Sequence, residues 1–302
     1  MPILAATQTR RRHAFTVDVE DYYQVSGFAK TVPFGDWASY PSRVVENTQR
    51  VLSLLERHAV RGTFFILGWV AERHPELVRD IQAAGHEIGC HSYAHQIVYE
   101  LSPDEFRDDL RRGRDILAEI TGEPIVSYRA PSFSITDRSL WALETLAEEG
   151  FTIDASIYPI RHDRYGIPRA DLVPHRIQTD AGMLWEFPGT CCSWGRFKLP
   201  VGGGGYLRLF PRWVTERGLH SIENRHQRVF GVYVHPWELD PDQPRLPARL
   251  LTRIRHYRNL NATEHRLERL LERFEFTTIS DVLADVAAEQ VPVYCSKGLY
   301  RG

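Results

Sequence analysis

Two histidines, His91 and His95, stand four positions apart directly after the strand-like run 87–90. Imidazoles at i and i+4 can reach one ion from a single turn, and a carboxylate from another segment would complete a set of three ligands with open positions. Far upstream, a second strand-like run, 15–21, ends in acidic residues. Together these features predict a divalent metal site, and such a site indicates hydrolytic chemistry.

The acidic run offers more than one candidate ligand. Because side chains alternate along a strand, Asp18 and Glu20 would point to the same side. The longer Glu20 would then reach the ion, while Asp18 stays free to accept a proton from water. Asp21 could be the ligand instead if the strand has already ended there. Other interpretations are a chance pair among 13 histidines and an Asp18 that only caps a turn.

Short β-rich runs alternate with amphipathic helical segments, which is typical of βα units around a parallel sheet or barrel. We expect an α/β fold, a distorted (β/α) barrel of roughly seven or eight parallel strands, with an open doubly wound sheet as the competing architecture. The helix at 103–121 has a capping-box start at Ser102 and Glu105 and a stop at Gly122. Strands are expected at 14–19, 62–67, 86–91, 125–129, 151–154, 183–187 and 229–235, and further helices at 43–58, 75–84, 137–149, 211–218, 246–258 and 263–274.

The alternating rhythm changes after about residue 190, where a loop-rich stretch contains the four glycines 202–205. No Lys-Ser or Lys-Thr follows them, which disfavours a phosphate-binding loop and favours a lid or a close backbone approach. We expect residues 1–240 to form the barrel, with an insertion near 190–228. Residues 241–302 are expected to form a C-terminal helical extension.

The composition is that of an ordinary globular protein: 302 residues, 43% hydrophobic, with a formal net charge of −2. This near-neutral charge argues against a nucleic-acid binder, and no apolar run is long enough to span a membrane. The basic residues 10–12 are followed by a strand rather than a long apolar stretch, so no signal peptide is expected. Four cysteines without a CxxC pattern fit a reducing compartment. We therefore expect cytoplasmic localisation.

Five ordered motifs between about residues 14 and 238 resemble those of the polysaccharide deacetylases of carbohydrate esterase family four. Most family members place two adjacent aspartates after the first strand, whereas Val19 separates the acids here. The 18–25 and 203–206 segments look more like a bacterial subgroup associated with exopolysaccharide production and exosortase systems, whose members carry an extra C-terminal domain of unknown function. The motifs are Thr16-Val17-Asp18-Val19-Glu20-Asp21, His91-Ser92-Tyr93-Ala94-His95, Arg129-Ala130-Pro131-Ser132-Phe133, Asp154-Ala155-Ser156 and Val232-Tyr233-Val234-His235-Pro236-Trp237.

The resemblance implies metal-dependent removal of N-acetyl groups from amino sugars of a polysaccharide or its precursor. One divalent ion, zinc first and cobalt or nickel otherwise, would be held by the two histidines and either Glu20 or Asp21. Exopolysaccharide assembly proteins are candidate partners, and the sequence leaves the oligomeric state open. Two other functions compete with this one: hydrolysis of another C–N bond, as in a cyclic amide or ureide, and a catalytically silent carbohydrate-binding component.

Roles for the remaining motif residues follow from the same chemistry. Asp18 would be the base, paired with and oriented by Arg129. His235 would protonate the leaving nitrogen, and Asp154 would hold the His235 imidazole. Each of these roles has a structural alternative. Arg129 could form only a surface salt bridge, His235 could be a packed residue at a strand end, and Asp154 could belong to an ordinary turn. Candidate substrate contacts are Pro131, Phe133, Tyr206 and Trp237, with core packing as the alternative for the aromatic side chains.

Overall fold

The computed structural model describes residues 11–195, 197–287 and 290–300. Ten strands form one sheet in the order β10-β1-β2-β3-β4-β5-β7-β6-β12, with β11 added beside β1. The strands are β1 (Arg12–Val19), β2 (Thr63–Ile66), β3 (Glu87–Cys90), β4 (Ser127–Tyr128), β5 (Ile153–Asp154), β6 (His175–Gln178), β7 (Met183–Glu186), β10 (Gly231–Val234), β11 (Glu275–Thr277) and β12 (Val293–Cys295), and β8 (Cys191–Trp194) forms a separate hairpin with β9 (Phe197–Pro200).

The sheet is parallel from β10 through β1, β2, β3, β4 and β5 to β7, and β6 joins β7 in antiparallel orientation. The predicted α/β fold with a mostly parallel sheet is confirmed. Among the described strands no pairing joins β12 to β10, so the sheet is not a closed barrel. Each predicted strand corresponds to a strand of this sheet; β1 is longer than predicted, and the others are shorter.

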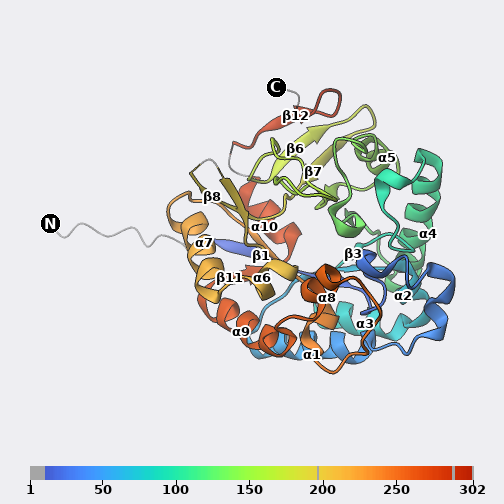
Figure 1. Cartoon of the computed structure of the whole chain (residues 1–302). Coiled ribbons are helices and arrows are strands. Elements are labelled where there is room, and N and C mark those ends of the chain that lie inside the picture. Colours follow the sequence, from blue (N-terminus) through green and yellow to red (C-terminus); the bar gives the residue numbers. More distant parts are fainter. Residues whose placement is uncertain (1–10, 196, 288–289, 301–302) are drawn as a thin grey trace.

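Helices lie around the sheet in Figure 1, with α1, α3 and α9 along one side and α4 and α5 along another. None of the described helices combines the length and apolar composition needed to cross a bilayer. The helices are α1 (Val44–Arg57), α2 (Gly68–Arg73), α3 (Pro75–Ala83), α4 (Pro103–Thr121), α5 (Ala142–Glu148), α6 (Gly204–Leu209), α7 (Arg212–Asn224), α8 (Leu250–Tyr257), α9 (Thr263–Arg273) and α10 (Ile279–Val286).

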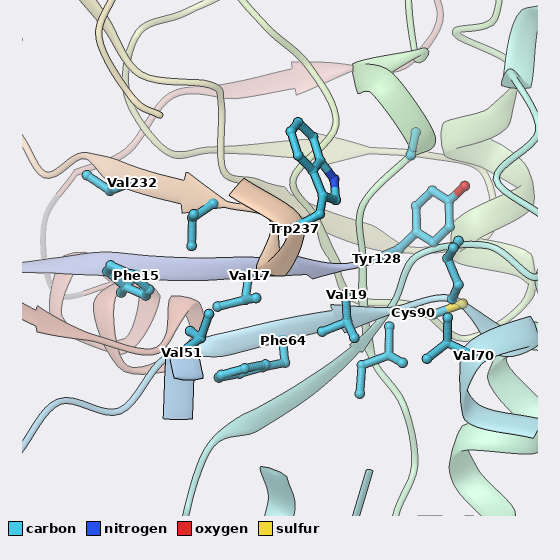
Figure 2. Close-up of a cluster of buried hydrophobic side chains, with 14 of the residues drawn as sticks. Phe15, Val17, Val19, Val51, Phe64, Val70, Cys90, Tyr128, Val232 and Trp237 are labelled. Atoms are coloured by element: carbon cyan, nitrogen blue, oxygen red, sulfur yellow. The ribbon is translucent and has the colours of Figure 1, made fainter. Parts of the chain in front are cut away.

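Strand β1 is buried along almost its whole length because both of its faces are covered. Phe15, Val17 and Val19 belong to the main hydrophobic core, together with Val51 of α1, as Figure 2 shows. Side chains alternate along a strand, so Thr16 and Asp18 project to the opposite face. This alternation directs the polar residues of β1 toward the interior of the curved sheet.

Helix α4 has the ends that its sequence predicts. The Ser102 side chain accepts from the Glu105 backbone N–H, and the Glu105 carboxylate accepts from the Ser102 backbone N–H. Gly122 follows the helix with a φ of 70°, the left-handed conformation that glycine adopts at low energy. The two signals confirm both predicted ends of this helix.

The later part of the chain is more varied than a helical extension. The 190–228 stretch contains the β8–β9 hairpin together with α6 and α7, and the 241–302 stretch adds β11 and β12 to helices α8, α9 and α10. Gly203 has a φ of 134°, and a Cβ there would lie 2.0 Å from the Tyr233 carbonyl oxygen. The close backbone approach predicted for the glycine run is therefore present.

Candidate metal centre

The candidate residues meet at the C-terminal ends of neighbouring parallel strands. Asp18 is on β1, His91 directly follows β3, Arg129 directly follows β4 and His235 directly follows β10. In an open or closed parallel α/β sheet these strand ends share one edge, which is where ligands bind. The topology therefore brings together residues that are more than two hundred positions apart.

Glu20, His91 and His95 form a group of potential metal ligands, with one donor atom from each within 4.8 Å of the others. Donor atoms of these types, gathered this closely, could hold one divalent ion. All three residues are buried, and Glu20 Oε2 makes no hydrogen bond although it lies 2.8 Å from His95 Nε2. A buried carboxylate oxygen without a hydrogen-bond donor fits a cation at this position.

The imidazole of His91 is prepared for ligation through Nε2. Its Nδ1–H donates to the Arg129 carbonyl oxygen at 2.7 Å, which leaves Nε2 with a free lone pair. Burial is the main cause that lowers the pKa of His91 to about 4. A neutral imidazole oriented by a backbone carbonyl is the form in which histidine binds metals.

The turn that carries both histidines is held by Asp109 of α4. Its carboxylate accepts from the Ser92 hydroxyl, from the Tyr93 backbone N–H at 3.0 Å and from the Ala94 backbone N–H at 3.1 Å. Ser92 and His95 both have positive φ values, 70° and 54°. The three hydrogen bonds stabilise a backbone conformation that non-glycine residues rarely adopt.

Our sequence reasoning missed Asp109, although a signal exists. Phe106, Leu110, Gly113 and Leu117 line the buried face of α4, and Asp109 lies among them at helical spacing. A Cβ at Gly113 would lie 3.0 Å from the Ser92 carbonyl group. The glycine therefore lets the helix approach the histidine turn closely enough for Asp109 to reach it.

Asp18 pairs with Arg129, as predicted. Arg129 Nη1 donates to Asp18 Oδ1 and to Thr16 Oγ1, each at 2.7 Å, and Nε donates to the Ala155 carbonyl oxygen at 3.2 Å. Asp18 Oδ2 points instead toward His235, 3.8 Å from Nε2. One carboxylate oxygen is thus occupied by the guanidinium, and the other faces the candidate site.

His235 is held by Glu238, and this corrects the prediction that Asp154 holds it. His235 Nδ1 hydrogen-bonds Glu238 Oε1, while Nε2 lies 3.6 Å from Glu20 Oε1. Burial opposes the charged imidazolium, but the bond to Glu238 and the charges of Glu20, Glu238 and Asp18 outweigh burial and raise the pKa of His235 to about 9. These interactions favour the protonated imidazole.

Glu238 is in turn fixed by the buried side chain of Arg208, whose Nε donates to Glu238 Oε2 at 2.6 Å. Burial tends to raise the pKa of Glu238, but Arg208 and His235 together lower it to about 2. A charged Glu238 is thus stabilised on both oxygens. The sequence carried a signal for it: Pro236 and Glu238 occupy the first and third positions of a short helix whose N-cap is His235, the arrangement of a capping box.

Asp154 has other partners. Its Oδ1 accepts from the Ser156 hydroxyl, and it faces Glu186 on the adjacent strand β7. Burial first, then the neighbouring Asp154 carboxylate, raises the pKa of Glu186 well above its usual value. The Ser156 hydroxyl also accepts from the Ala130 backbone N–H at 2.8 Å. The pair therefore supports the segment behind Arg129 rather than the His235 imidazole.

Asp21 lies outside the ligand group, which corrects its candidacy as the metal carboxylate. Its Oδ2 accepts from the Ser42 hydroxyl at 2.7 Å and from the backbone N–H groups of Arg43 and Val44 at 2.9 and 3.2 Å. These donors lie at the start of α1. Asp21 therefore caps that helix from outside and has its hydrogen-bonding capacity occupied.

The four candidate substrate contacts are mostly packed. Trp237 is buried, stacks on His235 and His256, and donates from Nε1 to Glu20 Oε1 at 3.1 Å, so it orients a ligand rather than presenting a face to sugar. Pro131 and Phe133 are buried, and the Phe133 ring packs on Tyr158 and Tyr233.

Tyr206 is only partly buried, and its hydroxyl lies 2.8 Å from that of Tyr165. Core packing accounts for Phe133 and Trp237, whereas substrate contact at Tyr206 stays a prediction.

Two segments of the chain match known family models. Residues 34–150 match the family model described as polysaccharide deacetylase. This segment is similar to the polysaccharide deacetylase family. Residues 155–284 match a second model, a domain of unknown function (DUF3473), which spans the predicted boundary at residues 240 and 241.

Curated relatives match this chain over only part of their own length. A peptidoglycan-N-acetylglucosamine deacetylase of Bacillus cereus is 36% identical over 101 residues, which cover 33% of this chain and 37% of that protein. A peptidoglycan deacetylase-like protein of Gibberella zeae is 29% identical over 163 residues, covering 51% of this chain and 46% of that protein. The chain thus spans about a third to a half of these relatives.

The fold extends beyond the segment matched in sequence. A crystal structure described as a putative polysaccharide deacetylase from Mycobacterium smegmatis superposes with a TM-score of 0.62 at 22% identity, covering 92% of this chain and 90% of the other. At this identity the likeness concerns the fold.

Proposed function

We propose that this protein is a metal-dependent hydrolase that removes N-acetyl groups from amino sugars of a polysaccharide or its precursor. The observation that carries the proposal is the convergence of Glu20, His91 and His95, with Asp18 and His235 facing the same point. The family match and the deacetylase names of the relatives support the reaction class.

A divalent ion at Glu20, His91 and His95 would polarise the acetyl carbonyl and acidify water, with zinc the ion best suited to this nitrogen and oxygen donor set. Asp18 Oδ2 would accept the proton of the attacking water, because Oδ1 is already held by Arg129. The C–N bond then breaks, and acetate leaves as the sugar nitrogen is protonated.

His235 would supply that proton. Its Nδ1 is held by Glu238, so Nε2–H is the donor directed at the site. Its hydrogen bond to Glu238 raises the pKa of His235 and favours the protonated imidazole. The base is on β1, and the acid directly follows β10. An arginine orients each of them: Arg129 contacts Asp18 directly, and Arg208 acts on His235 through Glu238.

An acetate-release assay on N-acetylated chito-oligosaccharides tests the proposal. We expect acetate release that a chelator abolishes and added zinc restores. Asp18→Asn should lower turnover by about 10²- to 10⁴-fold while metal stays bound. The matched control is Asp137→Asn, since Asp137 is an exposed carboxylate paired with Arg169, and this variant should keep the wild-type rate.

Each outcome has a definite meaning. Near-normal turnover in Asp18→Asn would make the base assignment wrong. Metal binding without acetate release from any N-acetylated sugar would redirect the search to other C–N bonds. For the natural substrate we propose an exopolysaccharide or its precursor, and parallel assays on N-acetylated exopolysaccharide and on peptidoglycan fragments would distinguish it from the substrate class named for the relatives.

A further inference from the structure

Helix α8 turns an apolar side toward solvent. The exposed fractions are 72% for Leu250, 57% for Leu251 and 39% for Ile254. Residues at i, i+1 and i+4 lie within about 100° of one another around a helix, so the three side chains form one stripe. A single exposed leucine is ordinary on a protein surface, but three together on one helix face indicate a contact surface.

Arginines flank this stripe. Between Gln243 and Thr263 the sequence contains five arginines and no aspartate or glutamate, in a chain whose net charge is −2. No carboxylate of the described residues lies within 4.0 Å of these five guanidinium groups. The five are Arg245, Arg249, Arg253, Arg255 and Arg258. The surface of α8 therefore carries a local excess of positive charge that the fold leaves uncompensated.

The inner side of α8 is fastened to the candidate metal centre. His256 is buried and stacks on Trp237 with ring centroids 4.0 Å apart, and Trp237 donates to Glu20. Arg208 donates to the carbonyl oxygens of Arg255, His256 and Arg258 at the end of the helix, and the same guanidinium holds Glu238. Whatever binds the outer side of α8 thus sits a few side chains from the catalytic groups. Figure 1 shows α8 beside α6, which carries Arg208.

We propose that the outer face of α8 docks on an anionic phospholipid bilayer. An apolar stripe between arginines is the pattern of helices that lie in the membrane interface, where the leucines enter the acyl boundary and the arginines meet lipid phosphates. The helix spans only about 12 Å, so it lies on the surface and does not cross it. A soluble acidic polysaccharide would use the arginines but leave the leucines in water. A second copy of the chain would place like charges opposite each other.

Vesicle co-sedimentation of the full chain tests this docking without any catalytic readout, so its result is independent of the proposed deacetylation. The probes are vesicles of equal parts phosphatidylcholine and phosphatidylglycerol, and vesicles of phosphatidylcholine alone. Wild type should bind the mixed vesicles, less so at high salt, and bind the neutral vesicles at least about tenfold more weakly. Leu250→Ser with Leu251→Ser, and separately Arg249→Gln with Arg253→Gln, should each reduce binding about tenfold or more.

Two controls match these changes elsewhere on the surface. Val293→Ser removes an exposed apolar side chain from β12, and Arg111→Gln with Arg112→Gln removes two charges from α4; both should bind as wild type does. Circular dichroism checks that each variant is folded. If the serine variant does not fold, the arginine variant still tests the proposal. The proposal is overturned if wild type does not bind the mixed vesicles, or if the α8 variants bind them equally well. It is also overturned if the chain binds a soluble acidic polysaccharide in place of vesicles. A dimer in ultracentrifugation that the α8 substitutions dissociate would overturn it as well.

Discussion

Glu20 and Asp21 are adjacent carboxylates with different partners. Glu20 faces two histidines and has an oxygen without a hydrogen bond, whereas Asp21 accepts backbone N–H groups at the start of α1. Glu20→Gln should therefore lower the metal bound per chain while the fold is kept. Asp21→Asn should retain the metal but reduce the free energy of unfolding by about 1–2 kcal/mol, because a helix cap is weakened.

Elemental analysis and urea denaturation of the two variants measure these effects side by side. If Asp21→Asn lost the metal and Glu20→Gln kept it, the ligand assignment would be reversed. The sequence could not separate the two, because strand alternation excludes Asp21 only if the strand continues past Val19. The deciding fact is tertiary: the donors that occupy Asp21 come from residues 42–44.

The partner of His235 is a second residue-level contact that the sequence did not predict correctly. From the sequence we expected the Asp154 carboxylate to hold the His235 imidazole, yet Asp154 faces Glu186 on the neighbouring strand. Glu238 stands three residues after His235 and was available as a local signal. Residue types and spacing predicted the candidate ligand group and the Asp18–Arg129 pair, whereas the orienting partners depended on local turns and on Arg208.

At the scale of elements, α4 positions the histidine turn through Asp109. Asp109→Asn would replace one acceptor oxygen by an amide that donates, opposite the Ser92 hydroxyl and the Tyr93 N–H. We expect metal affinity to fall by about 10- to 100-fold, as for other residues that orient metal ligands. Asp108→Asn is the matched control. Asp108 is the exposed neighbour of Asp109 on the same helix, so this variant should keep the wild-type metal affinity. Competition with a zinc chelator measures the affinity of each variant. Equal zinc affinities for Asp109→Asn and Asp108→Asn would show that Asp109 does not position the histidine turn for metal binding.

The junction between α3 and β3 makes stability depend on pH. His86 Nδ1 accepts from the Gly62 backbone N–H at 3.1 Å, and burial, then Arg61, lowers the pKa of His86 to about 4. The unfolded chain, with a histidine pKa near 6.5, binds this proton at higher pH, so stability is fully present above about pH 6.5 and is lost as pH falls toward 4.

His86→Asn keeps an acceptor but does not titrate. Between about pH 6.5 and 4, wild type should lose free energy of unfolding more steeply than the variant, by an extra slope approaching about 1.4 kcal/mol per pH unit. Denaturation curves at several pH values measure both slopes. Parallel slopes would show that His86 does not titrate differently in the folded and unfolded chains.

For the whole molecule, the sequence was most informative where elements repeat a regular pattern. The alternation of β-rich runs and amphipathic segments predicted the parallel strands β1, β2, β3, β4, β5, β7 and β10, and the capping signals predicted the ends of α4. It was least informative after residue 190. Strands such as β11 and β12 are three residues long, and their stability comes from β1 and β6, partners that no local pattern reveals.

Barrel closure is also a property of the whole molecule. Periodicity indicates how many strands form but not whether the last one returns to the first, and here the antiparallel β6 follows β7 at the far edge of the sheet. The position of the site does not depend on closure, because the ends of parallel strands share one edge in either architecture.

The most direct test of the central claim is the metal content of the purified chain after reconstitution with zinc, measured by elemental analysis beside His91→Ala. We expect about one zinc per wild-type chain and a loss of stoichiometric binding in His91→Ala. A wild-type chain that binds no metal, or a His91→Ala variant that binds it equally well, would contradict the assignment of Glu20, His91 and His95 as a metal centre.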